Sequence, residues 1–157
     1  MSVPESSFDA LLARAKEIDG LEFGCVLDAA TGMVLGTVRA DKARESGGAD
    51  GRIPVAAAGA ADVAGAVSLM AGALAADEGL EDVIITLTGH YHLIRRFDPT
   101  PRLQFLLLVV LDRARANLAM ALRQLRDLHV DPPPVPEPVG GRHREAPGPG
   151  EGDGVLS

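Results

Sequence analysis

Hydrophobic and polar positions alternate along the chain in a pattern that predicts three helices and five strands between Ser6 and Val130. The first helix is the clearest, because five apolar side chains recur at the spacing of one helical face: Phe8, Leu11, Leu12, Ala15 and Ile18. Gly20 is expected to end this helix in the left-handed conformation. Strands are then expected over 23–27 and 33–38, a helix over 54–79, strands over 83–88, 91–97 and 103–111, and a helix after Asp112.

The five strands are expected to form one mainly antiparallel sheet. Asp28 and Gly32 enclose a short connection typical of a tight hairpin, and Gly89-His90 indicates a second hairpin. The run 103–111 is almost entirely apolar, as expected for a strand that is buried on both faces in the middle of a sheet. The predicted fold class is therefore an α/β sandwich, with the second helix on one face of the sheet and the first and third helices on the other.

The second helix has an unusual composition, because Asp62 and Ser68 are its only polar side chains between Val55 and Ala76. A stripe of larger side chains is predicted to face the chain's own sheet: Val63, Val67, Met70 and Leu74. Beside this stripe lies an arc of alanine, serine and glycine. Each glycine inside a helix costs about 1 kcal/mol relative to alanine, so its presence requires a reason.

An arc of small apolar residues allows a second helix to approach closely, and a domain of this size has no further layer to supply one. We therefore predict a homodimer with an antiparallel, two-fold contact through this helix. The predicted interface continues onto the strand over 83–88 and comprises Ala57, Ala61, Ala64, Gly65, Ser68, Ala71, Gly72, Ala75, Ile84 and Thr86. The alternative interpretation is that the alanine content reflects coding bias.

Composition excludes several classes of protein. The chain has 157 residues, a net charge of −7 and one cysteine, so a disulfide scaffold is excluded and a reducing, cytoplasmic location is expected. The acidic balance argues against a general affinity for nucleic acid. The polar residues 2–9 do not resemble a signal peptide, and the uncharged stretches are short or rich in alanine and glycine. No direct membrane insertion is expected.

The composition changes after Val130, which places the domain at 1–130 and a tail at 131–157. The tail contains seven of the 11 prolines and is predicted to be disordered and partly of the polyproline type. Pro133-Pro134-Val135-Pro136 is interpreted as part of a spacer, with docking into an aromatic groove as the alternative. The polar stretch 40–52, which includes Gly47-Gly48, is predicted to be a flexible loop.

No motif for catalysis or for cofactor binding is present in the sequence. A phosphate-binding loop, a dinucleotide fingerprint and a paired-histidine zinc helix are all missing. His90 and His92 could point to one face of a strand, but no third ligand is nearby in sequence, so they are interpreted as a turn histidine and an outward strand histidine. Cys25 is interpreted as a small buried hydrophobic residue. We expect no enzymatic activity, no cofactor and no metal site.

The order of elements and two local stretches resemble the roadblock/dynein-light-chain family. One stretch runs from Gly20 to Asp28 and continues over Thr31-Gly32-Met33-Val34-Leu35; the other joins 82–86, 91–94 and 105–112. The resemblance covers roughly residues 5 to 129, and it implies a roadblock-like sandwich, related to profilin and longin folds, with the order α-β-β-α-β-β-β-α. Bacterial members of the family resemble non-catalytic adaptors that homodimerise through the second helix and the third strand and regulate or scaffold small Ras-like GTPases.

The expected function is therefore a homodimeric adaptor or regulator that binds a Ras-like small GTPase or its signalling complex. Candidate partner-binding residues are Asp62 and Leu69 on the second helix and Arg95 and Arg96 on a strand. The two arginines are adjacent, so they should point to opposite faces of the sheet; an exposed one could contact a carboxylate or phosphate of a partner. The alternative function is a small-molecule sensor domain, which the scarcity of aromatic and inward polar residues disfavours.

Overall fold

The protein is described by a computed structural model that covers residues 5–41 and 50–130, with side chains from Phe8 to Asp41 and from Gly51 to Val130. The elements are α1 (Glu5–Lys16), β1 (Leu21–Asp28), β2 (Val34–Arg39), the 3-10 turn η1 (Asp50–Arg52), α3 (Ile53–Leu74), β3 (Asp82–Thr86), β4 (His90–Thr100), β5 (Leu103–Asp112) and α4 (Leu118–Asp127). The predicted order of three helices and five strands is confirmed. The predicted tail over 131–157 and residues 42–49 of the predicted loop lie outside the described residues.

All five strands form one antiparallel sheet in the order β2-β1-β5-β4-β3. β5 occupies the centre, and its side chains from Phe105 to Val109 are buried on both faces, as its apolar sequence predicts. β2 and β3 are the two edges, and each pairs with a single neighbour within the described residues.

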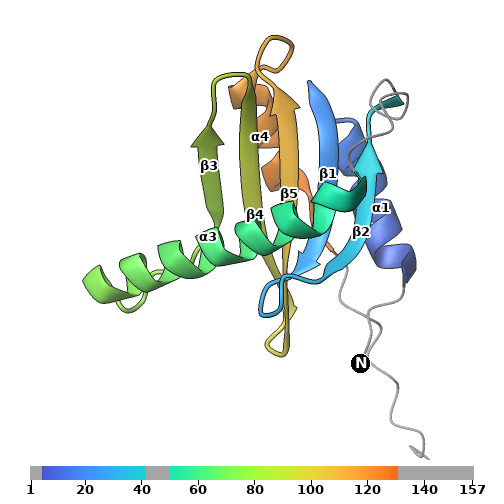
Figure 1. Cartoon of the computed structure of the whole chain (residues 1–157). Coiled ribbons are helices and arrows are strands. Elements are labelled where there is room, and N and C mark those ends of the chain that lie inside the picture. Colours follow the sequence, from blue (N-terminus) through green and yellow to red (C-terminus); the bar gives the residue numbers. More distant parts are fainter. Residues whose placement is uncertain (1–4, 42–49, 131–157) are drawn as a thin grey trace, which may run out of the picture.

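Helices cover the two faces of the sheet unequally (Figure 1). On one face, α1 and α4 enclose the larger core, which includes Phe8, Phe105 and Leu125. On the other face, α3 alone packs on the sheet and buries a smaller cluster around Cys25, Leu27 and Leu106. The predicted distribution of helices between the faces is therefore confirmed.

Two glycines fix the backbone where the sequence predicts turns. Gly20 has a φ of 81° after the first helix, and a Cβ atom there would lie 2.6 Å from the Ala116 Cβ. Gly32 has a φ of 72° in the β1–β2 turn, where Asp28 accepts hydrogen bonds from the Thr31 backbone amide and hydroxyl at 2.9 and 2.7 Å. At Gly20 the chain passes close to Ala116, and at Gly32 it passes close to Ala58 of α3.

Two predicted helix boundaries are wrong. α3 ends at Leu74, before the predicted stop at Gly79, because the chain becomes extended at Ala75 and returns toward β3. The last helix begins at Leu118, where the Asn117 side chain accepts from the Met120 amide at 3.2 Å, a normal N-cap. Asp112 instead ends β5, and its side chain accepts from the Ala114 amide at 2.9 Å in the turn between β5 and α4.

Candidate self-association and partner interface

The two halves of α3 lie in different surroundings. The first half crosses the sheet, and its residues Ala57, Ala60 and Ala64 are buried against it. The second half extends past the edge strand β3, as Figure 1 shows, and its large side chains are exposed: Leu69 by 77%, Met70 by 61% and Leu74 by 87%. We call the segment from Gly65 to Leu74 the overhang.

The roles predicted for the two stripes of α3 are wrong in part. The small residues face the chain's own sheet, so Ala57 and Ala64 are buried within one chain and are not free to contact a second copy. The physical reason is that Leu27, Ile94, Leu106 and Leu108 fill this face of the sheet, so small side chains on the helix allow it to approach closely. The larger stripe lies on a flank of the helix, where Val63 and Val67 are half-buried while Met70 and Leu74 are exposed.

The two flanks of α3 point toward opposite ends of the sheet. A Cβ atom on Gly32, in the β1–β2 turn, would lie 3.2 Å from the Ala58 Cα, so the Ala58 flank faces that turn. At 100° per residue, Gly65 and Gly72 follow Ala58 on this flank. Both are exposed, and a Cβ atom added to either would have no neighbour within 4 Å. The flank with Met70 and Leu74 therefore faces the other end of the sheet.

The remaining predicted interface residues lie where a second copy could reach them. Ala61, Ser68, Ala71 and Ala75 are half-buried on the sheet-facing side of the helix and its end. On β3, Ile84 is 45% exposed and Thr86 is exposed, and the edge of β3 away from β4 has no strand beside it among the described residues. An unpaired edge strand presents backbone donors and acceptors to another strand.

The part of the sheet that α3 leaves uncovered is partly apolar. Ile94 and Leu108, under the helix, are buried to 1% and 3% exposure, whereas His92 and Val110, the next residues toward the other end on the same face, are only half-buried. Val110 lies between His92 on β4 and Phe23 on β1. We call this surface, formed by Phe23, Ile85, His92 and Val110, the uncovered half of the sheet.

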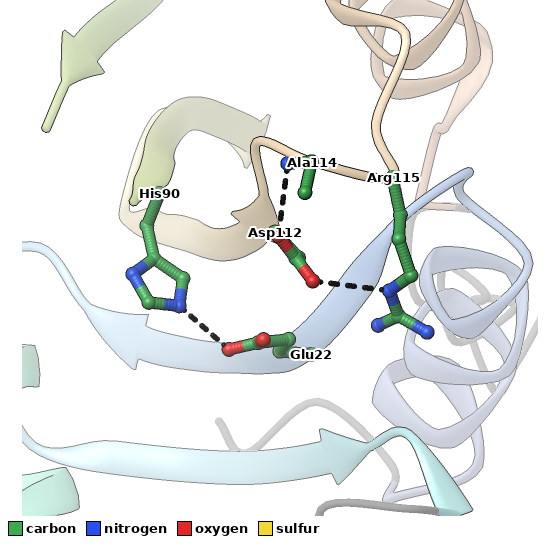
Figure 2. A network of polar contacts seen from close by, with 5 residues as sticks. All are labelled: Glu22, His90, Asp112, Ala114 and Arg115. Carbon is green, nitrogen blue, oxygen red and sulfur yellow. Dashed lines mark hydrogen bonds and ion pairs between the residues drawn. The ribbon is translucent and has the colours of Figure 1, made fainter. Parts of the chain in front are cut away.

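A polar cluster borders the uncovered half of the sheet (Figure 2). His90 Nε2 lies 2.9 Å from Glu22 Oε2, so a side chain of β4 contacts one of β1 although β5 lies between these strands. Asp112 pairs with the Arg115 Nε at 3.1 Å. His92 has no acidic partner in this cluster, and burial, followed by the neighbouring His90 imidazole, lowers the pKa of His92 below its ordinary value. The predicted turn histidine, His90, is therefore the first residue of a strand and is held by Glu22.

The four candidate partner-binding residues differ in their availability. Asp62 and Leu69 are exposed on α3, as a partner surface requires. Arg95 is not free: its Nη1 donates to the nearly buried Asp82 carboxylate at 2.7 Å, and its guanidinium lies 5.8 Å from the Phe97 ring centre. Arg96 donates to Asp98 at 3.0 Å with its side chain 25% exposed.

The arginines lie on opposite faces, as predicted, but a role for Arg95 in contacting a partner conflicts with its internal ion pair. Asp82 also accepts from Arg126 of α4 at 3.3 Å, so one carboxylate joins β3, β4 and α4. In the described part of the molecule, the buried Arg95 Nε has no hydrogen-bond partner. The sequence places adjacent arginines on a strand but does not show which of them an acidic residue on the neighbouring strand will hold.

The prediction that Cys25 is a small buried hydrophobic residue is confirmed. Cys25 is fully buried under α3, and burial raises the pKa of its thiol to about 11. Within residues 5–41 and 50–130, no group of three or more histidine, cysteine or acidic side chains is arranged to hold a metal ion. In the same part of the chain no polar or charged residue is buried, so nothing in the core resembles a polar ligand pocket.

α3 also has the length and composition of a membrane-spanning helix. It has 22 residues with a mean hydropathy of 1.6, and 17% of its most apolar window is buried. A single helix of this kind is weak support for a membrane role, so the expected absence of membrane insertion stays a prediction. An apolar helix that is buried as little as α3 needs a partner surface.

Similarity to known proteins is found in structure and not in sequence. No protein-family model matches the chain, and no curated protein is similar to it in sequence. The gliding protein MglB from Thermus thermophilus has a similar structure, with a TM-score of 0.64 at 16% identity over 80% of this chain and 85% of that chain. The chain has the roadblock/LC7 fold.

Two further solved structures agree with the roadblock/LC7 fold. An MglB with a tetrameric arrangement gives a TM-score of 0.63 at 16% identity, covering 80% of this chain and 85% of that chain. A Roadblock/LC7 domain from Streptomyces avermitilis gives 0.54 at 14% identity, covering 75% and 88%. The predicted roadblock-like sandwich is therefore confirmed, whereas identities this low establish the fold and leave partners to be argued from the surface.

Proposed function

We propose that the chain is a non-catalytic adaptor that self-associates through α3 and β3 and that regulates or scaffolds a small Ras-like GTPase. The observation that carries the proposal is the overhang, an uncharged apolar half-helix that extends past the edge strand β3 (Figure 1). The MglB structures with the same fold, one of them in a tetrameric arrangement, support self-association.

The geometry of one chain is self-complementary. If two copies of β3 pair antiparallel, a two-fold axis passes through the pair at right angles to the sheet. This axis places the second copy's overhang above the uncovered half of the first copy's sheet. It also places the first copy's overhang above the uncovered half of the second copy's sheet. The segment from Ala66 to Leu74 is about 13 Å long, and two strand spacings are about 10 Å, so the overhang reaches β4 of the other copy.

The proposed dimer uses only part of the arc of small residues on α3. The flank with Met70 and Leu74 faces the two-fold axis and therefore the second helix, while Ser68 and Ala71 face the second copy's sheet. Gly65 and Gly72 point to the opposite flank together with Asp62 and Leu69. This outer flank stays open in the dimer, and we propose it as the surface that contacts the GTPase.

Self-association is tested by sedimentation velocity of the full chain between 1 and 100 µM. We expect a dimer, and we expect Met70→Glu to give a monomer because it buries a carboxylate between apolar helices. Met120→Glu is the matched control, since Met120 is 51% exposed on α4, on the other face of the sheet. A wild-type monomer throughout this range, or equal effects of the two variants, would contradict the proposed interface.

The GTPase assignment has its own test. A small Ras-like GTPase from the same source is purified, loaded with GDP or a GTP analogue, and titrated with the full chain. We expect nucleotide-dependent binding that Leu69→Glu weakens at least tenfold while the dimer persists. Binding of neither nucleotide form would refute the GTPase role and leave self-association standing.

A further inference from the structure

The uncovered half of the sheet contains an ionisable group in an unusual position. His92 lies between Ile85 of β3 and Val110 of β5, both apolar, and is half-buried before any second copy is added. Its side chain points to the same face as Ile94 and therefore toward the side on which α3 packs. In the proposed dimer this is the surface that the second copy's overhang covers.

Among the described residues, the charged groups around His92 do not offer it a counter-ion. His90 is its neighbour on the same strand and face, and the nearest carboxylate, Glu22, is already 2.9 Å from His90 (Figure 2). Asp112 pairs with Arg115 and stands opposite His90 in the register. Arg39, the charged residue of β2, lies in the same cross-strand row as His92 but is separated from it by Val110 and Phe23.

The helices facing His92 add no compensating charge either. From Ile53 to Leu74 the only charged residue of α3 is Asp62, which is exposed on the first half. The overhang has none, and the next acids, Asp77 and Glu78, follow its end and are exposed. A protonated imidazole covered by the overhang would therefore be a charge without a partner, which is strongly unfavourable.

We propose that His92 makes self-association sensitive to pH, with acidification favouring the separated chains. The inference rests on the proposed dimer and adds a regulatory property to it. Neutral His92 is compatible with the covering helix, whereas its protonated form is better solvated in the separated chain. Proton binding is thus linked to dissociation.

The direction of the effect follows from linkage. Covering His92 lowers its pKa further than burial already does in the single chain, so the separated chains bind protons at a pH where the dimer does not. Each pH unit below the pKa of the separated chain costs about tenfold per copy, and a dimer has two copies. Between pH 7.5 and 5.5 we expect the dimer Kd to rise by at least about tenfold.

The test measures the dimer Kd of the full chain by sedimentation velocity at pH 7.5, 6.5 and 5.5. Wild type and His129→Gln should show the same rise, since His129 is exposed and lies beyond α4. His92→Gln should flatten the dependence. A wild-type Kd that does not change with pH, or a His92→Gln variant that keeps the full dependence, overturns the inference while the dimer stands. A monomer at every pH overturns the dimer itself.

A second measurement does not depend on a variant that folds. The His92 Cε1 proton is titrated by NMR at concentrations below and above the dimer Kd at pH 7.5. The inference requires a lower pKa for His92 in the concentrated sample. Equal values at the two concentrations would contradict it, because they would show that the second copy does not cover this side chain.

Discussion

The two halves of α3 are both apolar, but they lie in opposite surroundings. The first half covers Leu27 and Leu106 and places its alanines where the sheet leaves little space. The second half carries Leu69, Met70 and Leu74, which are more than half exposed. The comparison shows that α3 buries its side chains in a single chain only where the sheet lies beneath it.

The largest expected difference is between a leucine of β1 that lies beneath the first half of α3 and a leucine of the second half itself. Leu27 is fully buried under the first half, so Leu27→Ala should lower the free energy of unfolding by about 2–5 kcal/mol. Leu74→Ala, at 87% exposure, should change it by less than about 0.5 kcal/mol in dilute protein. Urea unfolding at sub-micromolar concentration measures both. Comparable losses would show that the overhang is packed within one chain.

The second comparison enlarges one alanine in each half. Ala57 is fully buried at the crossing, and Ala57→Leu should destabilise the fold by about 1–3 kcal/mol through overpacking. Ala66 is exposed, so Ala66→Leu should leave the unfolding midpoint nearly unchanged. Thermal unfolding of both variants checks this. Tolerance of leucine at position 57 would mean that the first half is not tightly seated.

A small increase in stability is expected from a substitution at Gly65, where the two halves of α3 meet. Gly65 is helical and has open space around it, so Gly65→Ala should raise the free energy of unfolding by about 0.5–1 kcal/mol. Gly32→Ala is the contrasting variant, because its φ of 72° and the nearby Ala58 should make it destabilising. Urea titration distinguishes the two signs. A destabilised Gly65→Ala would show that another surface occupies this flank.

The last prediction is that the Cys25 thiol does not react in the native protein. Cys25 lies beneath the first half of α3, and a thiol whose pKa is about 11 stays protonated at pH 8. Ellman's reagent should therefore react with native protein at least about 100 times more slowly than with unfolded protein. Fast labelling of the native chain would indicate that the first half of α3 lifts readily from the sheet.

Local patterns predict most of the fold. The stripe from Phe8 to Ile18, Gly20, the Asp28–Gly32 turn and the apolar run of β5 each act over a few residues, so the sequence specifies them directly. The roadblock-like arrangement follows from their order. The end of α3 and the start of α4 are less predictable, because a return path to β3 and an Asn117 cap compete with equally plausible signals at Gly79 and Asp112.

From the sequence, the candidate interface could be assigned to the second helix but not to particular residues of it. The sequence shows that α3 is apolar nearly all round, but it does not show where the sheet stops beneath it. For this reason the small residues are predicted at the dimer contact, although Ala57 and Ala64 are buried within the chain. Likewise, the pairing of Arg95 with Asp82 depends on the β3–β4 register, which adjacent residues along a strand do not reveal.

The most direct test of the proposed dimer compares the two edges of the sheet. Single spin labels at Thr86→Cys on β3 and Thr37→Cys on β2 give distances between copies by dipolar EPR, since both threonines are exposed and Cys25 is buried. The proposed pairing of β3 predicts about 15–30 Å for the Thr86 label and roughly 43 Å, nine strand spacings, for the Thr37 label. A short distance at Thr37 with a long one at Thr86, or no dipolar coupling for either label, would contradict it.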